Sequence, residues 1–312
     1  MISKCLYCYK FLNKNEIDFH TTCSKRFFGT EFTPEIPFII SDIEKLALTV
    51  LGKSVSVTGV QPKISVETEK LSRNHSRFTI VGLWGNYILK PPVKEYPEMC
   101  EIEDLTMHLA SLLKIKVAKH SLIRLKSGEI CYITRRFDRV KKLKLHVEDM
   151  AQLTGKLTEY KYKGSMEKVA SIVAEFSSSP GLDLYGLYEL TLFSFLTGNA
   201  DMHLKNFSLI TGLDDEIRLS PAYDLLSTKL LIPEDKEQLA LTINGKKNRL
   251  TYKDFRAFGL KLQIPEKSLE TVRKKFISNR ENVTQFIEKS FLSNTAIEKY
   301  LTLYEERLNL LT

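Results

Sequence analysis

The pattern of apolar and polar residues predicts an extended first part of the chain and a helical second part. Runs rich in β-branched and aromatic residues predict pairs of strands within residues 53–65, 78–90 and 118–136. Apolar residues at helical spacing interrupt them over residues 97–113, and a shorter amphipathic helix is expected over residues 41–51. We therefore expect a strand-rich lobe, with the strands of residues 78–90 joined as a hairpin at a Gly-Asn turn.

Beyond residue 149 the apolar residues recur mostly at the period of an α-helix. One short hairpin is expected there, with strands at residues 207–210 and 217–219. The predicted helices cover residues 150–157, 166–176, 182–197, 252–258, 266–289 and 294–311, the fifth with an interruption near Asn282. Strands followed by helices predict an α+β fold of two lobes, with the boundary near residues 136–149.

Composition limits the class of protein. The 312 residues, 43% of them hydrophobic and 27% charged, are typical of a soluble globular protein. No apolar run approaches the roughly 18 residues of a membrane-spanning helix, and the first residues lack the apolar core of a signal peptide. Five cysteines without a regular framework favour reduced thiols or a metal site over disulfides. We therefore expect a cytosolic protein without a membrane partner.

The formal net charge of +8 favours polyanionic partners, although the basic residues are spread along the chain. The densest clusters lie at residues 139–144, 246–249 and 273–275. Each cluster can be a solvated surface, or can bind ATP phosphates, an acidic protein or nucleic acid. The sequence shows no helix-turn-helix or RNA-binding signature that would support nucleic acid.

Polar residues gather immediately after the predicted buried helix at residues 182–197. This helix breaks at Gly198, and the next residues carry Asp201 and Asn206, five positions apart. The catalytic aspartate and the metal-binding asparagine of protein kinases have this spacing. A solvated loop is the alternative interpretation. Asp224 arrives after the predicted hairpin, and since Mg²⁺ takes oxygen ligands from one or two side chains and from phosphates, Asn206 and Asp224 are candidate ligands.

A lysine ends the predicted strand before the first long helix. Lys90 is followed by two prolines, and Glu101 and Glu103 lie in the first turns of that helix. Protein kinases assemble the Lys-Glu pair that holds the nucleotide phosphates in this order, although surface lysines are common. The strands predicted within residues 53–65 join around Gly59, which is a weak signal for a phosphate-binding loop and also fits a plain hairpin.

Two pairs of metal-ligand type open the chain. Cys5 and Cys8 form one pair, and His20 and Cys23 form the other. Two short pairs are what a structural zinc site uses, because they supply four soft or borderline ligands with little loss of chain entropy. The alternative is that the cysteines are small buried apolar residues.

Together these motifs resemble the HipA family of bacterial serine/threonine kinase toxins, and most closely its short form, the HipT toxins of three-gene systems. The similarity covers nearly the whole chain, from the Cys/His segment through the stretch that begins at Gly198. Its other motifs are Ser-Val-Thr-Gly-Val-Gln-Pro-Lys at 56–63, Tyr-Ile-Leu-Lys-Pro at 87–91, Arg-Phe-Asp-Arg at 136–139, His-Val-Glu-Asp-Met-Ala-Gln at 146–152 and Ala-Tyr-Asp-Leu at 222–225. The resemblance implies a bilobal protein-kinase-like fold, in which an N-terminal Cys/His segment (residues 1–30) packs on the kinase N-lobe (31–137), and a helical C-lobe with the catalytic loop covers 138–312.

The resemblance implies a role for each residue of the loop. Asp201 is expected to orient and deprotonate the substrate hydroxyl. His203 and Lys205 are expected near the phosphates, where Lys205 would offset negative charge. Asn206 and Asp224 correspond to the magnesium ligands of the family.

The resemblance also implies an ATP site and its regulation. Lys90 would anchor the phosphates, with Glu103 as its partner and Glu101 in reserve. The other residues expected at the nucleotide are Val57, Thr58, Gly59, Arg136, Phe137 and Tyr223. Ser54 and Ser56 are expected to be autophosphorylated, because a phosphate there would repel ATP or pull the loop out of the site.

The implied function is that of a toxin kinase in the bacterial cytoplasm, which phosphorylates a translation component and arrests growth. An aminoacyl-tRNA synthetase is the best candidate substrate. The chain is expected to lack the small N-terminal subdomain of longer family members, so a small inhibitory HipS-like protein and a helix-turn-helix HipB-like antitoxin are expected partners, with DNA contacted only through the antitoxin. Leu225 replaces the Phe-Gly that follows the aspartate of ordinary protein kinases, so their activation-loop switch is not expected here.

Two other functions are open. A phosphoinositide or small-molecule kinase shares the Asp-x-His-x-x-Asn pattern, but the chain lacks an amphipathic membrane segment and has a Ser-Val-Ser loop. The second alternative function is that of a catalytically inactive zinc-knuckle binding module. The joint presence of Lys90, Asp201, Asn206 and Asp224 argues against it, because an inactive site has no physical reason to keep all four.

Overall fold

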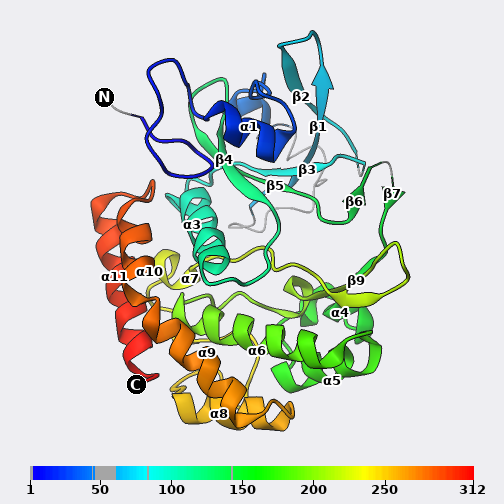
Figure 1. Ribbon diagram of the computed structural model, residues 1–312, viewed down its shortest axis with the longest axis vertical. Helices are drawn as coiled ribbons and strands as arrows, with labels where there is room; N and C mark the ends of the chain where they lie inside the picture. The colour runs from blue at the N-terminus through cyan, green and yellow to red at the C-terminus, as the bar shows by residue number, and fades with distance from the viewer. Residues whose placement is uncertain (1–2, 44, 46–60, 83, 142) are drawn as a thin grey trace. The chain divides into compact units, whose positions relative to one another are not determined.

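The computed structural model describes residues 3–43, 45, 61–82, 84–141 and 143–312 (Figure 1). The chain divides into two compact units. The first unit contains Met1–Asp104, Ala118–Phe137 and Lys289–Phe291, and the second contains Leu105–Val117, Asp138–Glu288 and Leu292–Thr312. The first unit is rich in strands and the second is mainly helical, so the predicted α+β class is confirmed.

An antiparallel sheet of five strands forms the centre of the first unit. Its strands are β1 (Ile64–Lys70), β2 (Ser76–Ile80), β3 (Tyr87–Lys90), β4 (His120–Arg124) and β5 (Ile130–Arg135), in the order β2-β1-β3-β5-β4. The hairpin predicted for residues 118–136 is the β4-β5 pair, which turns at Gly128 with φ 105°.

The hairpin predicted for residues 78–90 is wrong. Both strands exist, but β1 lies between them, and Val66 pairs with Ile80 on one side and with Tyr87 on the other. The turn passes so close to β1 that a Cβ at Gly85 would lie 2.6 Å from the Val66 carbonyl oxygen. Gly85 and Asn86 therefore do not close a hairpin, and the strands on either side of them both pair with β1.

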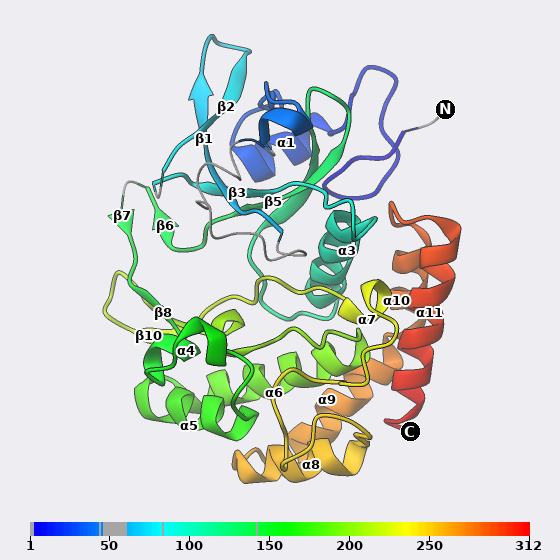
Figure 2. The same ribbon diagram turned by 180° about the vertical axis from the view of Figure 1, so that it is seen from behind.

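Helix α1 (Thr21–Phe28), labelled in Figure 2, is the first helix of the first unit. Its Phe27 and Phe28 are buried in the core of that unit. The ring of Phe28 lies 5.9 Å from that of Phe78, and the rings of Phe78 and Tyr87 lie 5.4 Å apart. The predicted helix over residues 41–51 begins at residue 40, and most of it falls outside the described residues. Helix α3 (Met99–Leu112) matches the helix predicted over residues 97–113, and the division between the units falls inside it, after Asp104.

The second unit has a small antiparallel sheet beside its helices. The predicted hairpin is formed by β9 (Ser208–Thr211) and β10 (Ile217–Leu219), and an additional strand, β8 (Val147–Asp149), pairs with β9. A two-stranded ribbon, β6 (Arg139–Val140) and β7 (Leu143–Lys144), comes before it.

The predicted helices of the second unit are present in order, and α7 (Thr228–Leu231) is an additional short helix that was not predicted. The others are α4 (Met150–Leu153), α5 (Met166–Phe176), α6 (Pro180–Leu196), α8 (Tyr252–Lys261), α9 (Glu266–Ser278), α10 (Arg280–Glu288) and α11 (Asn294–Asn309), with 3₁₀ turns at Thr158–Tyr160 and Leu204–Asn206. The interruption expected near Asn282 falls at Asn279, where α9 ends. No helix in the described ranges combines the length and the apolar character that a membrane crossing requires.

Helix α6 is the most deeply buried helix of this unit, as its apolar sequence predicted. Every residue from Leu187 to Leu196 is buried. The Phe195 ring lies 5.0 Å from that of Phe255 on α8, and the guanidinium of Arg307 on α11 lies 4.6 Å over the Phe195 ring. Burial lowers the pKa of Arg307 to about 10, so it remains charged at neutral pH while it donates to the Phe195 carbonyl at 3.1 Å.

The end of α6 requires a glycine. Gly198 has φ 68°, and a Cβ there would lie 2.6 Å from Leu303 Cδ2 and 2.9 Å from Lys229 Cβ. We expect Gly198→Ala to lower the free energy of unfolding by about 2–4 kcal/mol, measured by urea denaturation. Gly186→Ala, inside the same helix and with open space around its Cβ, is the control. It should be neutral or stabilise by up to about 1 kcal/mol, and equal losses in both variants would contradict the prediction.

Candidate active site

The loop that carries Asp201 is held to α7 by two hydrogen bonds. The Lys229 amide donates to the Gly198 carbonyl at 3.0 Å, and the Ala200 amide donates to Thr228 Oγ1 at 2.9 Å. Inside the loop, the Asp201 amide donates to Asn199 Oδ1 at 3.0 Å. These bonds fix the backbone at Asp201, because donors and acceptors beyond the end of α6 are satisfied by specific partners and not only by water.

The Asp201 carboxylate is partly exposed, with 42% of the side-chain surface accessible. The Tyr162 hydroxyl donates to Asp201 Oδ1, and His203 Nε2 lies 4.0 Å from the same oxygen. The rings of Tyr162 and His203 meet edge to face at 5.1 Å. The carboxylate is therefore oriented by its neighbours and remains open to a substrate.

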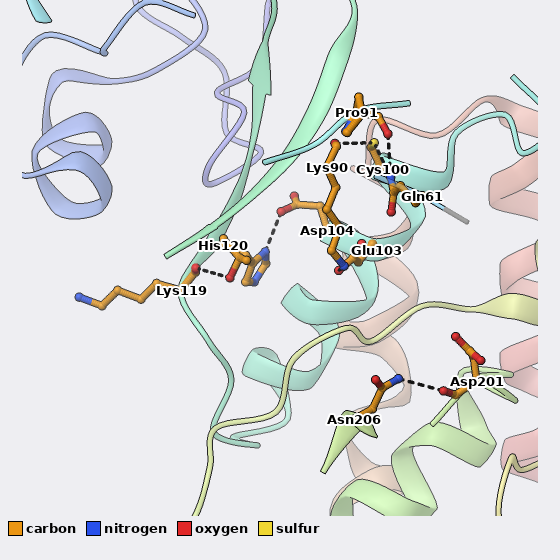
Figure 3. A network of polar contacts seen from close by, with 11 residues as sticks. Gln61, Lys90, Pro91, Cys100, Glu103, Asp104, Lys119, His120, Asp201 and Asn206 are labelled. Atoms are coloured by element: carbon orange, nitrogen blue, oxygen red, sulfur yellow. Dashed lines mark hydrogen bonds and ion pairs between the residues drawn. The ribbon is translucent and has the colours of Figure 1, made fainter. Parts of the chain in front are cut away.

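Asn206 is oriented by the backbone of Asp201. Its side-chain amide donates through Nδ2 to the Asp201 carbonyl at 2.9 Å, as Figure 3 shows. Since the amide nitrogen is used in this bond, the amide oxygen points elsewhere and can serve as a ligand. The two residues predicted from their spacing are thus brought together by a direct hydrogen bond.

Asp224 adopts an unusual backbone conformation. Its φ of 56° is left-handed, which aspartate tolerates better than most residues and which often marks a functional position. Asp224 lies near enough to His203 for its charge to raise that pKa, as the charge of Asp201 does. Burial has the larger effect and lowers the pKa of His203, so the imidazole is neutral at physiological pH. An amide oxygen and a carboxylate are hard oxygen ligands, so Asn206 and Asp224 fit a magnesium ion.

Lys205 does not stand alone in the loop. Its ammonium lies 2.8 Å from Asp149 Oδ2, and Asp149 also caps α4 by accepting the Gln152 amide at 2.9 Å. This role of Asp149 is not among those expected from the sequence, although the Asp-Met-Ala-Gln sequence is a capping signal. Tyr162 was missed too, because no local pattern indicates that its hydroxyl reaches Asp201.

Tyr223 holds its own segment against the loop. Its hydroxyl donates to the Lys205 carbonyl at 2.9 Å and lies 2.5 Å from Ser208 Oγ. Burial raises the pKa of Tyr223, so the phenol remains protonated. The expected contact of Tyr223 with a nucleotide stays a prediction, and the observed contacts give it a role in joining Asp224 to the loop.

In the first unit, Lys90 and Glu103 form a buried ion pair. The Lys90 ammonium lies 2.6 Å from Glu103 Oε1, and their side chains are 5% and 2% exposed. Lys90 Nζ also lies 5.2 Å over the Tyr132 ring. Removing two charges from water costs several kcal/mol per ion, so such a pair is poor evidence for a stabilising role and points to function. Of the two candidates, Glu103 is the partner of Lys90, whereas burial raises the pKa of Glu101 to about 7.

Gln61, in the segment that leads into β1, is anchored to the chain between β3 and α3. Gln61 Nε2 donates to the Pro91 carbonyl at 2.8 Å, and Cys100 Sγ donates to the Lys90 carbonyl at 3.4 Å, contacts drawn in Figure 3. The predicted loop residues Val57, Thr58 and Gly59 and the serines Ser54 and Ser56 fall outside the described residues.

Two groups of predicted residues remain. Arg136 and Phe137 follow β5, and the Arg136 amide donates to the Asn86 carbonyl at 2.9 Å. Their role at an adenine ring stays a prediction.

The structure brings Cys5, Cys8, His20 and Cys23 together, with one possible ligand atom from each within 4.8 Å of the others.

Comparison with known sequences identifies one family. Residues 55–284 match the model of the HipA-like C-terminal domain. A Haemophilus influenzae protein named "Putative kinase" is 27% identical over 311 residues, which cover 90% of this chain and 88% of that protein. The Shewanella oneidensis protein named serine/threonine-protein kinase toxin HipA is 28% identical over 218 residues, or 61% of this chain and 47% of that protein. The chain thus spans most of one relative and about half of the other.

Comparison with solved structures shows the fold. Shewanella oneidensis HipA, solved with HipB and its operator DNA, superposes with a TM-score of 0.70 at 20% identity, covering 96% of this chain and 74% of that chain. The Helicobacter pylori proinflammatory kinase CtkA superposes with a TM-score of 0.54 at 16% identity, covering 80% and 97%. The predicted HipA-like, protein-kinase-like fold is therefore confirmed.

The raised pKa of Glu101 predicts a pH-dependent cost to stability. Its ordinary value is 4.5 and burial raises it to about 7, so the folded state favours the protonated form. Folding stability is therefore least affected by Glu101 below about pH 4.5, and stability is lost as the pH rises through about 7 and the buried carboxyl ionises. We expect Glu101→Gln to raise the free energy of unfolding by roughly 1–3 kcal/mol at pH 8 and by less at pH 5, measured by urea denaturation. Glu95→Gln, at an exposed position, is the control for the substitution itself, and an equal gain at both pH values in Glu101→Gln would contradict the assignment.

Proposed function

Because the chain belongs to the HipA-like C-terminal domain family, we propose that it is a toxin-type, ATP-dependent serine/threonine protein kinase. The observation that carries the proposal is the pair formed by Asp201 and Asn206. The side-chain amide of Asn206 donates to the backbone carbonyl of Asp201, whose carboxylate is partly exposed. The kinase names of the relatives support it.

In the proposed reaction, Asp201 accepts the proton of a serine or threonine hydroxyl while that oxygen attacks the γ-phosphorus of ATP and ADP leaves. Tyr162 is bonded to Oδ1 of Asp201, so we assign Oδ2 to the substrate hydroxyl. His203 packs on the ring of Tyr162, which donates to Oδ1, and so supports the orientation of the carboxylate. Proton transfer by a positioned carboxylate contributes about 10²- to 10⁴-fold to such a step.

The remaining polar residues would hold the nucleotide. Asn206 and Asp224 would bind Mg²⁺, which when bound neutralises charge on the phosphates. Lys90, held by Glu103, would bind phosphate oxygens, and the buried ion pair keeps the ammonium in one orientation. Lys205 would offset charge on the transferred group, with Asp149 controlling its position. Val57, Thr58, Gly59, Arg136, Phe137 and Tyr223 complete the proposed ATP site.

The substrate and partners are part of the same proposal. We propose that the substrate is a translation component and that its phosphorylation arrests growth. An aminoacyl-tRNA synthetase is the first candidate. A helix-turn-helix antitoxin of the HipB kind is the expected partner, since the Shewanella HipA structure contains HipB and operator DNA. A small HipS-like inhibitor is the second partner, and DNA is contacted through the antitoxin.

A direct assay tests the kinase function. ATP turnover is measured with a bacterial protein extract, with phosphoinositide vesicles and with neither. The wild type should transfer phosphate to protein, and Asp201→Asn should reduce the rate by at least about 10²-fold, because the amide keeps the shape but cannot accept the proton.

Matched variants sharpen this assay. Glu103→Gln should impair ATP turnover, whereas Glu101→Gln, two positions away on the same helix and outside the ion pair, should leave it unchanged. Phosphate on lipid alone would favour the lipid-kinase alternative. No turnover under any condition would favour a binding module without activity.

Autophosphorylation gives a separate prediction. After incubation with Mg-ATP, mass spectrometry of the wild type should find phosphate on Ser54 or Ser56, and Asp201→Asn should carry none. Modified wild type should turn over ATP more slowly than the Ser54→Ala, Ser56→Ala double variant, because the added charge of about −1.5 to −2 opposes ATP phosphates. Unmodified serines in an active enzyme would refute this part of the proposal.

A further inference from the structure

We propose that Cys5, Cys8, His20 and Cys23 bind one structural zinc ion. The four residues come from two short segments of the first unit: Cys5 and Cys8 from a turn, and His20 and Cys23 from the start of α1. His20 is the residue before the first turn of that helix, and Cys23 lies in the turn itself. A metal bound by all four would therefore join the turn to the helix.

The distances between the ligand atoms fit a tetrahedral metal. His20 Nδ1 lies 3.4 Å from Cys8 Sγ and 3.6 Å from Cys23 Sγ. For zinc bonds of about 2.3 Å to sulfur and about 2.0–2.1 Å to nitrogen, a regular tetrahedron places sulfur and nitrogen about 3.5 Å apart. Weak hydrogen bonds of thiols alone would not require all four atoms to converge on one point.

The second nitrogen of His20 is already engaged. Nε2 lies 2.9 Å from the Phe11 carbonyl, which can only accept, so Nε2 carries the proton and Nδ1 presents its lone pair to the thiols. Metal-binding histidines are usually oriented by a hydrogen bond of this kind.

Two of the three cysteines in the cluster are more exposed than cysteines of the apolar core, and the third, Cys5, is fully buried. Cys8 and Cys23 are only partly buried, unlike Cys100 and Cys131, which are fully buried and lie outside the cluster. Tyr9 and Asp18 have left-handed backbones, with φ of 64° and 58°, in the loop between the ligand pairs. Three thiolates and an imidazole are soft and borderline ligands, which select zinc over magnesium or calcium. Four protein ligands leave no open position, so the ion would be structural.

The site would attach the N-terminal segment to the sheet and to α3. The Leu6 carbonyl accepts the Leu122 amide of β4 at 3.3 Å. The Tyr9 hydroxyl donates to Asp104 Oδ2 at 2.8 Å, and the other oxygen of that carboxylate lies 2.7 Å from His120 Nδ1. Asp104 follows Glu103 on α3, so the metal site supports the helix that carries the partner of Lys90.

Metal content of the full chain tests the proposal independently of kinase activity. Protein purified without a metal-affinity tag should contain about one zinc per chain by inductively coupled plasma mass spectrometry. Cys8→Ser and Cys23→Ser should lose most of it, whereas Cys131→Ala, a buried cysteine on β5 outside the cluster, should keep it. Iron in place of zinc, or equal zinc in all variants, would overturn the proposal.

A second measurement uses the wild type and therefore does not depend on whether the variants fold. The wild type is labelled with an alkylating reagent, with and without a strong chelator, and modified cysteines are located by mass spectrometry. Cys8 and Cys23 should be protected until the chelator is added, and the thermal midpoint should fall when zinc is removed and recover when zinc is returned. Rapid alkylation without chelator, or an unchanged midpoint, would show that the thiols bind no metal.

Discussion

The loop of Asp201 depends on one constraint at the end of a buried helix. Helix α6 must end where α7 and Leu303 of α11 leave no space for a side chain, and only glycine can take the left-handed turn there. The loop that follows is then bonded to α7 on one side, and Asn206 returns to the Asp201 carbonyl on the other. Rigid packing of an apolar helix thus places a polar loop with defined geometry, which a solvated loop would not have.

The polar groups around the loop are arranged in pairs that hold one another in position. Tyr162 fixes one oxygen of Asp201, Asp149 holds Lys205, and Tyr223 joins the segment of Asp224 to the loop. The cost of placing charges in a partly buried site is offset for Asp201 by a hydrogen-bond donor and for Lys205 by a partner of opposite sign. In the first unit, the Lys90 and Glu103 pair is an extreme case of the same arrangement, since both side chains are almost fully buried.

The first unit also couples its two unusual features through α3. Glu103 faces Lys90, and the next residue, Asp104, accepts a hydrogen bond from the Tyr9 hydroxyl and is paired with His120. The N-terminal Cys/His segment is therefore in direct contact with the helix of the ion pair. Buried aromatic residues of α1 already join this segment to the core, and the proposed metal ion would add a second restraint of the kind that small knuckles use.

The sequence by itself determined the elements with strong local signals. The apolar run before Gly198 predicted a buried helix, helical periodicity predicted α3 and the helices of the second unit, and the spacing of Asp201 and Asn206 and of the Cys/His pairs indicated which side chains would meet. These features depend on interactions within a few residues, which the sequence displays directly. Only the tertiary structure decided that β1 separates β2 from β3, that Glu103 rather than Glu101 faces Lys90, and that Tyr162 and Asp149 complete the loop. Those choices depend on contacts between residues far apart in the chain, where packing and desolvation select one partner among several that local patterns allow equally.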